Sequence, residues 1–198
     1  MSEKIGNIRL QAWVLVAGVL LMAVKFVAWR ITHSNTVLSD AMESIVNVAA
    51  GSFALYSLIL AAKPRDREHP YGHGKVEFIS AAIEGTLVAV AGTIIIYRAT
   101  VALFQGVEIH HLGPGTALIA FTGVANLALG LLLRNKGKRT HSLTMEAGGT
   151  HLLSDAWSSA ALVLGLLVIQ ATGLNWLDSL FAVGFAAFII RQLSLIHI

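Results

Sequence analysis

The chain has 198 residues, of which 56% are hydrophobic and 13% are charged, and its formal net charge is +3. Soluble domains carry about 25% charged residues, so this composition indicates a membrane protein. The absence of cysteine excludes disulfides, thiolate metal sites and cysteine catalysis. The basic residues lie between apolar segments without interleaved aromatic residues. We therefore expect no nucleic-acid partner and interpret the basic residues as topology signals.

Six apolar segments each approach or exceed the ~20 residues that cross a bilayer. They cover approximately residues 10–30, 37–62, 76–104, 116–133, 142–170 and 174–192. The first is longer than the roughly 7–15 apolar residues of a signal peptide, so we expect a membrane span there. The predicted fold is an all-α membrane protein with six transmembrane helices in one domain, residues 1–192.

Two polar segments, 63–75 (KPRDREHPYGHGK) and 134–139 (RNKGKR), are predicted to be loops. With six spans, these loops and both termini lie on one side of the membrane. All 14 lysines and arginines except Lys25, Arg30 and Arg98 fall on that side. The positive-inside rule therefore places both termini in the cytoplasm. Lys25 lies one turn from the end of the first span, and we expect its ammonium to extend to the interface.

The last six residues, 193–198 (LSLIHI), do not look like part of the membrane domain. They resemble a translated sequencing-adapter tail, so we interpret them as an atypical, artefactual tail. We expect the natural protein to continue differently from this point. No function is assigned to His197 in this segment.

Two apolar segments carry polar residues at helical spacing. In LSDAMESIVNV, the side chains of Asp40, Glu43 and Asn47 fall within an arc of about 60° at 100° per residue. In HLLSDAWSS, His151 and Asp155 are four residues apart and share one helix face. A charged group in the middle of a bilayer costs roughly several kcal/mol, so such residues persist when they are paired or functional. The alternative is a structural role as polar contacts between helices.

The two polar faces are predicted to meet at one depth. Asn47 lies about ten residues from the outer end of its span, and Asp155 about ten residues from the inner end of an antiparallel span. Both are then roughly 15 Å deep, near the middle of a ~30 Å core. We predict that Glu43, Asn47, His151 and Asp155 form one site for a divalent metal. Its two negative charges balance one cation, and its oxygen and nitrogen donors suit a tetrahedral or expandable shell.

Five further residues are candidates for an accessory metal site or a proton path: Asp40, His69, His73, Glu84 and Asp178. Asp40 would add a third negative charge. If Asp40 does not bind the metal directly, it could carry a proton, act as an outer-shell ligand or cap the start of its helix. His69 and His73 could hold a metal at an entry funnel, or they could shape the loop. For Glu84 and Asp178 the alternative is a structural ion pair, for example with Lys25.

The polar segments also resemble a known family, the cation diffusion facilitators, which transport divalent transition metals across membranes. The resemblance rests on LSDAMESIVNV, HPYGHGKVEFISAAIEG and HLLSDAWSS, and it covers approximately residues 8–192. It implies a cation-efflux transmembrane fold with the transport site between the second and fifth spans. It also implies exchange of metal for protons, a homodimer, and a soluble C-terminal metal-binding domain that we do not expect within these residues.

The resemblance implies zinc as the first expected cargo. The family usually has Asp or His where this chain has Glu43, and Asp where it has Asn47, so iron, cobalt, manganese, nickel and cadmium stay open. His151 is the expected proton-exchanging group, because imidazole changes its charge near neutral pH and metal displaces its proton.

We therefore predict a secondary transporter of the bacterial inner membrane, which is no enzyme and has no cofactor besides the transported cation. The alternatives are a passive divalent-cation channel and a structural membrane subunit. An intramembrane hydrolase is disfavoured, because the chain has H-x-x-x-D and no H-E-x-x-H helix.

Overall fold

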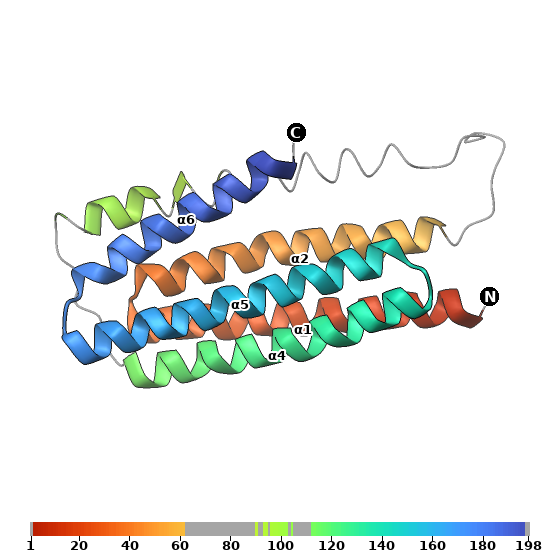
Figure 1. Cartoon of the computed structure of the whole chain (residues 1–198), viewed down its shortest axis with the longest axis horizontal. Coiled ribbons are helices and arrows are strands. Elements are labelled where there is room, and N and C mark those ends of the chain that lie inside the picture. The colour runs from red at the N-terminus through yellow and green to blue at the C-terminus, as the bar shows by residue number, and fades with distance from the viewer. Residues whose placement is uncertain are drawn as a thin grey trace.

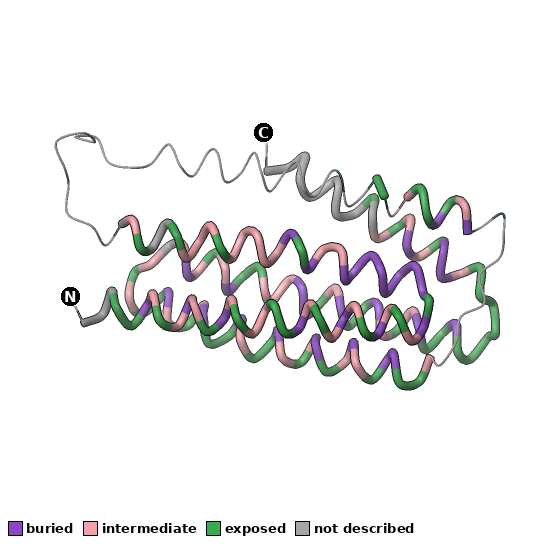
Figure 2. Tube along the Cα trace, turned by 180° about the vertical axis from the view of Figure 1, so that it is seen from behind, coloured by how far each residue is buried: buried purple, intermediate pink, exposed green. Residues whose placement is uncertain are grey.

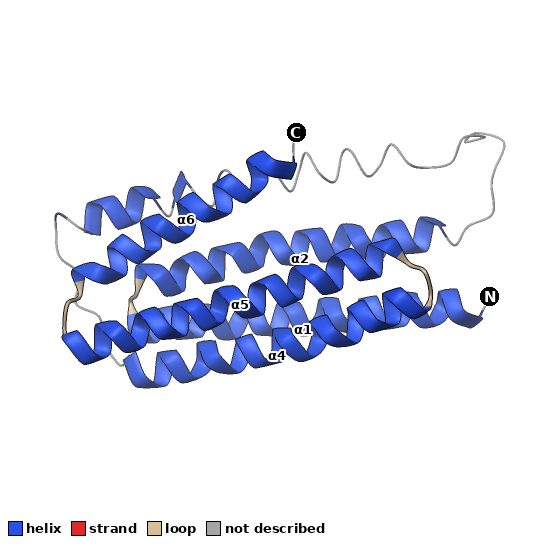
Figure 3. Cartoon of the chain, viewed as in Figure 1, coloured by secondary structure: helices blue, strands red, loops and turns tan. Residues whose placement is uncertain are grey.

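The structure, a computed structural model, describes residues 2–61, 90, 93–94, 96–102, 104 and 112–196. Within this part of the chain every regular element is a helix (Figure 3), which confirms the all-helical prediction there. The long helices are α1 (Ser2–Thr32), α2 (Asn35–Ala61), α4 (Leu112–Arg139), α5 (Leu143–Thr172) and α6 (Trp176–Ile196).

The helices pack as two antiparallel hairpins. α1 and α2 form one hairpin, α4 and α5 form the other, and α6 lies against α2 (Figure 1). Short connections produce antiparallel neighbours, and both turns contain a histidine in the left-handed region, His33 with φ 56° and His141 with φ 50°. α1 also packs against α4, and α2 against α5. The second contact brings together the two helices with the polar faces.

Glycines allow the backbones of α4 and α5 to approach closely. A Cβ atom at Gly137 would lie 2.6 Å from the backbone nitrogen of Glu146, a separation that real Cβ atoms do not show. A Cβ atom at Gly130 would lie 3.0 Å from the carbonyl oxygen of Gly149. Small residues at such positions are typical of helix pairs that pack in membranes. The sequence of this hairpin therefore fixes where α5, with its polar face, can lie.

Apolar side chains cover the outside of the bundle and polar ones lie within it. Large exposed apolar side chains include Trp13, Leu20, Phe121, Val124, Trp157 and Leu164. Buried polar side chains include Gln11, Lys25, Asp40, Asn126, Asp155 and Ser159. Figure 2 shows exposed positions along the outward faces of the helices. This inversion of the soluble pattern is expected of helices that face lipid.

Three helical segments are long and apolar enough to cross a bilayer: Ile5–Thr32, Leu112–Arg139 and Thr144–Thr172. Trp176–Phe185 is a shorter apolar helix. The three long segments match the predicted first, fourth and fifth spans. Trp176–Phe185 lies within the predicted sixth span but is shorter than a membrane crossing, and α2 coincides with the predicted second span without being among the segments long and apolar enough to cross. The predicted third span and the 63–75 loop fall mainly or wholly outside the described residues.

The prediction of a loop at residues 134–139 was wrong, because α4 continues through Arg139 and the turn follows at 140–142. α4 has 28 residues and is therefore about 42 Å long, more than a ~30 Å hydrocarbon core. Its last turn can extend beyond the lipid and still be helical. Lysine and arginine are good helix formers and are favourable near a helix C-terminus, which explains why this basic segment stays in the helix.

Candidate metal centre

The start of α2 is held by its own cap and by α6. The backbone N–H of Val37 donates to Ser34 Oγ at 3.1 Å, which makes Ser34 the N-cap. Ser34 Oγ in turn donates to Asp178 Oδ1 at 2.5 Å. The carboxylate of Asp178 also accepts hydrogen bonds from the backbone N–H groups of Asn35 at 2.6 Å and Thr36 at 3.2 Å. An anionic group at a helix N-terminus satisfies unpaired N–H groups and interacts favourably with the helix dipole.

This anchoring gives Asp178 a structural role as the group that ties α6 to α2. Its side chain is buried, and its two oxygens are already engaged by the first turn of α2. A role of Asp178 in an accessory metal site or a proton path stays a prediction. Because α2 is fixed at its start, the rotation of its polar face toward α5 is fixed as well.

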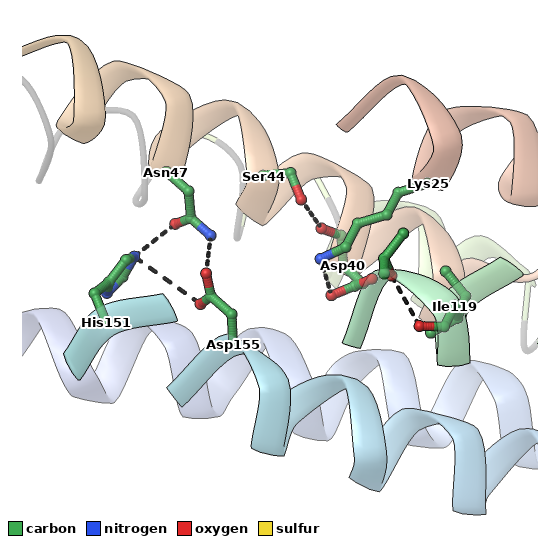
Figure 4. A network of polar contacts seen from close by, with 8 residues as sticks. Lys25, Asp40, Ser44, Asn47, Ile119, His151 and Asp155 are labelled. Atoms are coloured by element: carbon green, nitrogen blue, oxygen red, sulfur yellow. Dashed lines mark hydrogen bonds and ion pairs between the residues drawn. The ribbon is translucent and has the colours of Figure 1, made fainter. Parts of the chain in front are cut away.

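Three predicted ligands lie in direct contact between α2 and α5 (Figure 4). Asn47 Nδ2 donates to Asp155 Oδ2 at 2.7 Å. His151 Nε2 lies 2.8 Å from Asn47 Oδ1. His151 Nε2 and Asp155 Oδ1, one helical turn apart on α5, are separated by 4.0 Å. One amide thus bridges the imidazole and the carboxylate that face it across the helix interface.

Apart from the Asn47 amide nitrogen, which acts as a donor, the atoms that meet here are metal-ligating types: an imidazole nitrogen, an amide oxygen and carboxylate oxygens. Zinc, for example, binds imidazole nitrogen at about 2.0–2.1 Å and carboxylate oxygen at about 2.0–2.2 Å. Two tetrahedral ligands of one ion are then about 3.3 Å apart, so the observed separations of 2.8 and 4.0 Å need only small side-chain rotations. Two hydrogen bonds, both made by the Asn47 amide, hold the three side chains together, and a cation bound between them would take the place of the bridging protons.

These three residues line a cavity of about 540 Å³ between the hairpins. The side chain of His151 is 44% exposed, whereas that of Asp155 is 5% exposed. An ion in the cavity can therefore reach the imidazole first and the buried carboxylate behind it. Further polar side chains on the wall of the cavity are Gln11, Lys25, Ser44 and Asn126.

Glu43 is the one predicted ligand that does not join this contact. It lies one turn from Asn47 toward the start of α2, is half-buried, and makes no hydrogen bond or ion pair with Asn47, His151 or Asp155. Glu43 and Asp155 act on each other electrostatically. Its role as a fourth ligand stays a prediction, and it requires a change of the Glu43 side-chain rotamer.

Lys25 is not at the membrane interface, and the prediction that its ammonium extends there was wrong. Lys25 Nζ lies 2.8 Å from Asp40 Oδ1, and the two side chains are only 2% and 1% exposed. The sequence suggested Glu84 and Asp178 as partners of Lys25, but the structure pairs it with Asp40. Lys25 faces α2 across the packed α1–α2 interface, so its ammonium has the Asp40 carboxylate as its partner in place of water.

Three of the predicted accessory residues cannot be placed relative to the site. His69, His73 and Glu84 lie outside the described residues. Within the described part, no group of three or more histidine, cysteine or acidic residues is arranged to hold a metal, so a metal centre here would need Asn47 as a neutral ligand. Gln11, a buried polar side chain on the cavity wall, was not predicted from the sequence as a site residue. Its spacing of 14 residues from Lys25, which places both on one helix face, was the available signal.

Comparison with known proteins decides the family. Residues 10–195 match the family model of the cation efflux transmembrane domain. The chain belongs to the cation efflux family. This match confirms the resemblance to the cation diffusion facilitators, and with it the assignment to a family of membrane transporters.

Relatives within the cation efflux family include bacterial pumps. An uncharacterized transporter of Synechocystis sp. is 38% identical over 168 residues, which are 85% of this chain and 54% of that protein. The cation-efflux pump FieF of Shewanella oneidensis is 28% identical over 172 residues, 87% of this chain and 58% of the pump. The magnetosome protein MamM of Paramagnetospirillum magneticum is 29% identical over 169 residues, with shares of 84% and 53%. The chain spans little more than half the length of these relatives.

Proposed function

We propose that this chain is the membrane domain of a secondary transporter that exports divalent transition-metal cations from the cytoplasm in exchange for protons. The observation that carries the proposal is the contact of Asn47, His151 and Asp155 between α2 and α5. This contact lies within a chain of the cation efflux family, and relatives of the chain are named cation-efflux pumps.

In this proposal the metal is bound by Glu43, Asn47, His151 and Asp155. The two carboxylates neutralise a divalent cation, the amide oxygen completes the shell, and the imidazole gives up its proton on binding. A proton taken up from outside then returns to the imidazole, restores its hydrogen bond to Asn47 and helps to expel the metal. Zinc is the first expected cargo, with iron, cobalt, manganese, nickel and cadmium as further candidates.

The proposed topology has six transmembrane helices with both termini in the cytoplasm of a bacterium. The cavity extends from the level of Lys25 and Asp155 toward Gln11 in α1, Ala54 in α2 and Thr144 in α5. That end of the bundle holds the start of α1 and the basic end of α4, which the positive-inside rule assigns to the cytoplasm. The cavity would then admit metal from the cytoplasm, and rocking of helices about the site would release it outside. A homodimer is proposed on the family resemblance.

Transport into proteoliposomes tests this function. Protein is reconstituted with an imposed proton gradient, and uptake of Zn²⁺, Mn²⁺, Co²⁺ and Cd²⁺ is followed with an entrapped indicator. We expect gradient-dependent uptake by the wild type and at least a tenfold loss in Asp155→Ala. Glu146→Ala is the matched control, because it removes the same charge from α5 outside the cavity, and it should transport normally.

The outcomes separate the alternatives. Uptake that continues after the proton gradient is collapsed would indicate a passive channel. No uptake or binding of any tested ion by well-folded protein would favour a structural membrane subunit. Equal uptake by the wild type and Asp155→Ala would remove Asp155 from the mechanism.

A further inference from the structure

The buried ion pair of Lys25 and Asp40 lies at the closed end of the cavity, on the side away from Gln11 and Thr144. Lys25 Nζ and Asp40 Oδ1 are 2.8 Å apart (Figure 4), and neither side chain is more than 2% exposed. Lys25 lines the same cavity as Asn47 and Asp155. On α2, Asp40 precedes Asn47 by seven residues, which places it on the same face and about 10 Å farther along the axis.

Beyond the ion pair the bundle is closed by apolar packing. Ala28 follows Lys25 by three residues on α1, and Val37 precedes Asp40 by three residues on α2. Both belong to a buried apolar cluster: Ala28, Val37, Ile119, Leu162, Leu166 and Ile169. The ion pair is therefore at the boundary between the cavity with the proposed metal ligands and the sealed part of the bundle.

Such a pair is a poor choice for stability alone. Burying two charges costs desolvation energy, and apolar side chains of the same volume usually serve a core as well or better. The pair is also incompletely satisfied, because Asp40 Oδ2 is buried without a hydrogen-bond partner. These features indicate that the ion pair has a function beyond stability. Besides Asp40, the carboxylates of Asp155 and Glu43 interact electrostatically with Lys25.

We propose that Lys25 sets the metal affinity of the site by acting as a fixed internal counter-charge to Asp40. The Lys25 ammonium donates a hydrogen bond to Asp40 Oδ1 and thereby keeps the Asp40 carboxylate from binding the metal. The proposed metal site then has two negative charges, those of Glu43 and Asp155, and one divalent cation balances them. Without Lys25 a third negative charge would hold the cation too tightly for release. This inference rests on the proposed function.

Metal binding by charge-altered variants tests the inference. Wild type, Lys25→Met, Asp40→Asn and the double variant are purified in detergent and titrated calorimetrically. The probe is the ion that wild type binds most tightly among Zn²⁺, Mn²⁺, Co²⁺, Ni²⁺ and Cd²⁺. At about 10 Å, one unit charge should change the affinity for a divalent ion by roughly tenfold to a hundredfold.

The two single variants should shift affinity in opposite directions. Lys25→Met removes a positive charge and should bind more tightly by about tenfold or more. Asp40→Asn leaves the ammonium uncompensated and should bind more weakly by a similar factor. The double variant has the net charge of the wild type and should bind within about threefold of it. If Lys25→Met does not fold, Asp40→Asn and the double variant still give the comparison.

A merely structural pair would not produce opposite shifts. Weaker or unchanged binding in both single variants would overturn the inference. Much weaker binding by the double variant would also overturn it, because that result would make Asp40 a metal ligand. Absence of binding by folded wild type to every ion in the panel would instead overturn the proposed function.

Discussion

Replacing Asn47 by aspartate probes the proposed centre most informatively, because it changes the proposed neutral ligand into a charged one with almost no change in shape. Asn47 Nδ2 now donates to Asp155 Oδ2 at 2.7 Å. A hydrogen bond to a charged group contributes about 1.5–3 kcal/mol, and Asn47→Asp removes it. It also sets two carboxylates against each other, a repulsion of about 4 kcal/mol at 4 Å and an effective dielectric constant of 20. The metal-free variant should therefore be several kcal/mol less stable.

Metal should reverse this penalty, because the added carboxylate attracts the cation that relieves the repulsion. We expect Asn47→Asp to melt several degrees below wild type without metal. We also expect it to gain more from saturating Zn²⁺ and to bind Zn²⁺ at least tenfold more tightly in calorimetry. Asn47→Ala, which loses the hydrogen bond and the ligand without adding charge, should bind more weakly than wild type. An Asn47→Asp variant with unchanged melting temperature and unchanged affinity would refute the assignment of Asn47 to the centre.

Three further outcomes follow from the contacts of the helices. Asp178→Asn should lower the free energy of unfolding by about 1–3 kcal/mol in thermal denaturation, because it weakens the anionic cap of α2. Gly137→Ala should lower the melting temperature, because the added Cβ atom would push α4 away from the backbone of Glu146 in α5. Gly113→Ala should leave the melting temperature unchanged, because nothing lies within 4 Å of the added Cβ atom. His151→Ala should weaken Zn²⁺ binding at least tenfold in calorimetry at constant pH, because it removes the imidazole that contacts Asn47 and faces Asp155.

The helices and their order could be predicted because hydropathy and length determine them locally. The predicted spans at 10–30 and 116–133 lie within α1 and α4. Their ends were less predictable, since a basic segment such as 134–139 is compatible with a loop or with a helix that leaves the lipid. The choice depends on packing against α5, where Gly137 admits the close approach.

The contact of Asn47 with Asp155 was also predictable, because period and depth are enough to bring two antiparallel polar faces to one level. The partner of Lys25 was not, since several carboxylates are compatible with it by position and only the packing of α1 on α2 selects Asp40. The position of Asp178 beside the first turn of α2 likewise depends on the docking of α6. Rotation of individual side chains, such as that of Glu43, is beyond what periodicity determines.

The location of a bound ion tests the central claim most directly. Protein loaded with Cd²⁺ can be studied by anomalous X-ray diffraction, with His151→Ala as the comparison. We predict one ion between α2 and α5, within about 2.0–2.6 Å of ligand atoms of His151 and Asp155, and its loss or marked weakening in the variant. An ion bound elsewhere, with none between these two helices at saturating metal, would contradict the account.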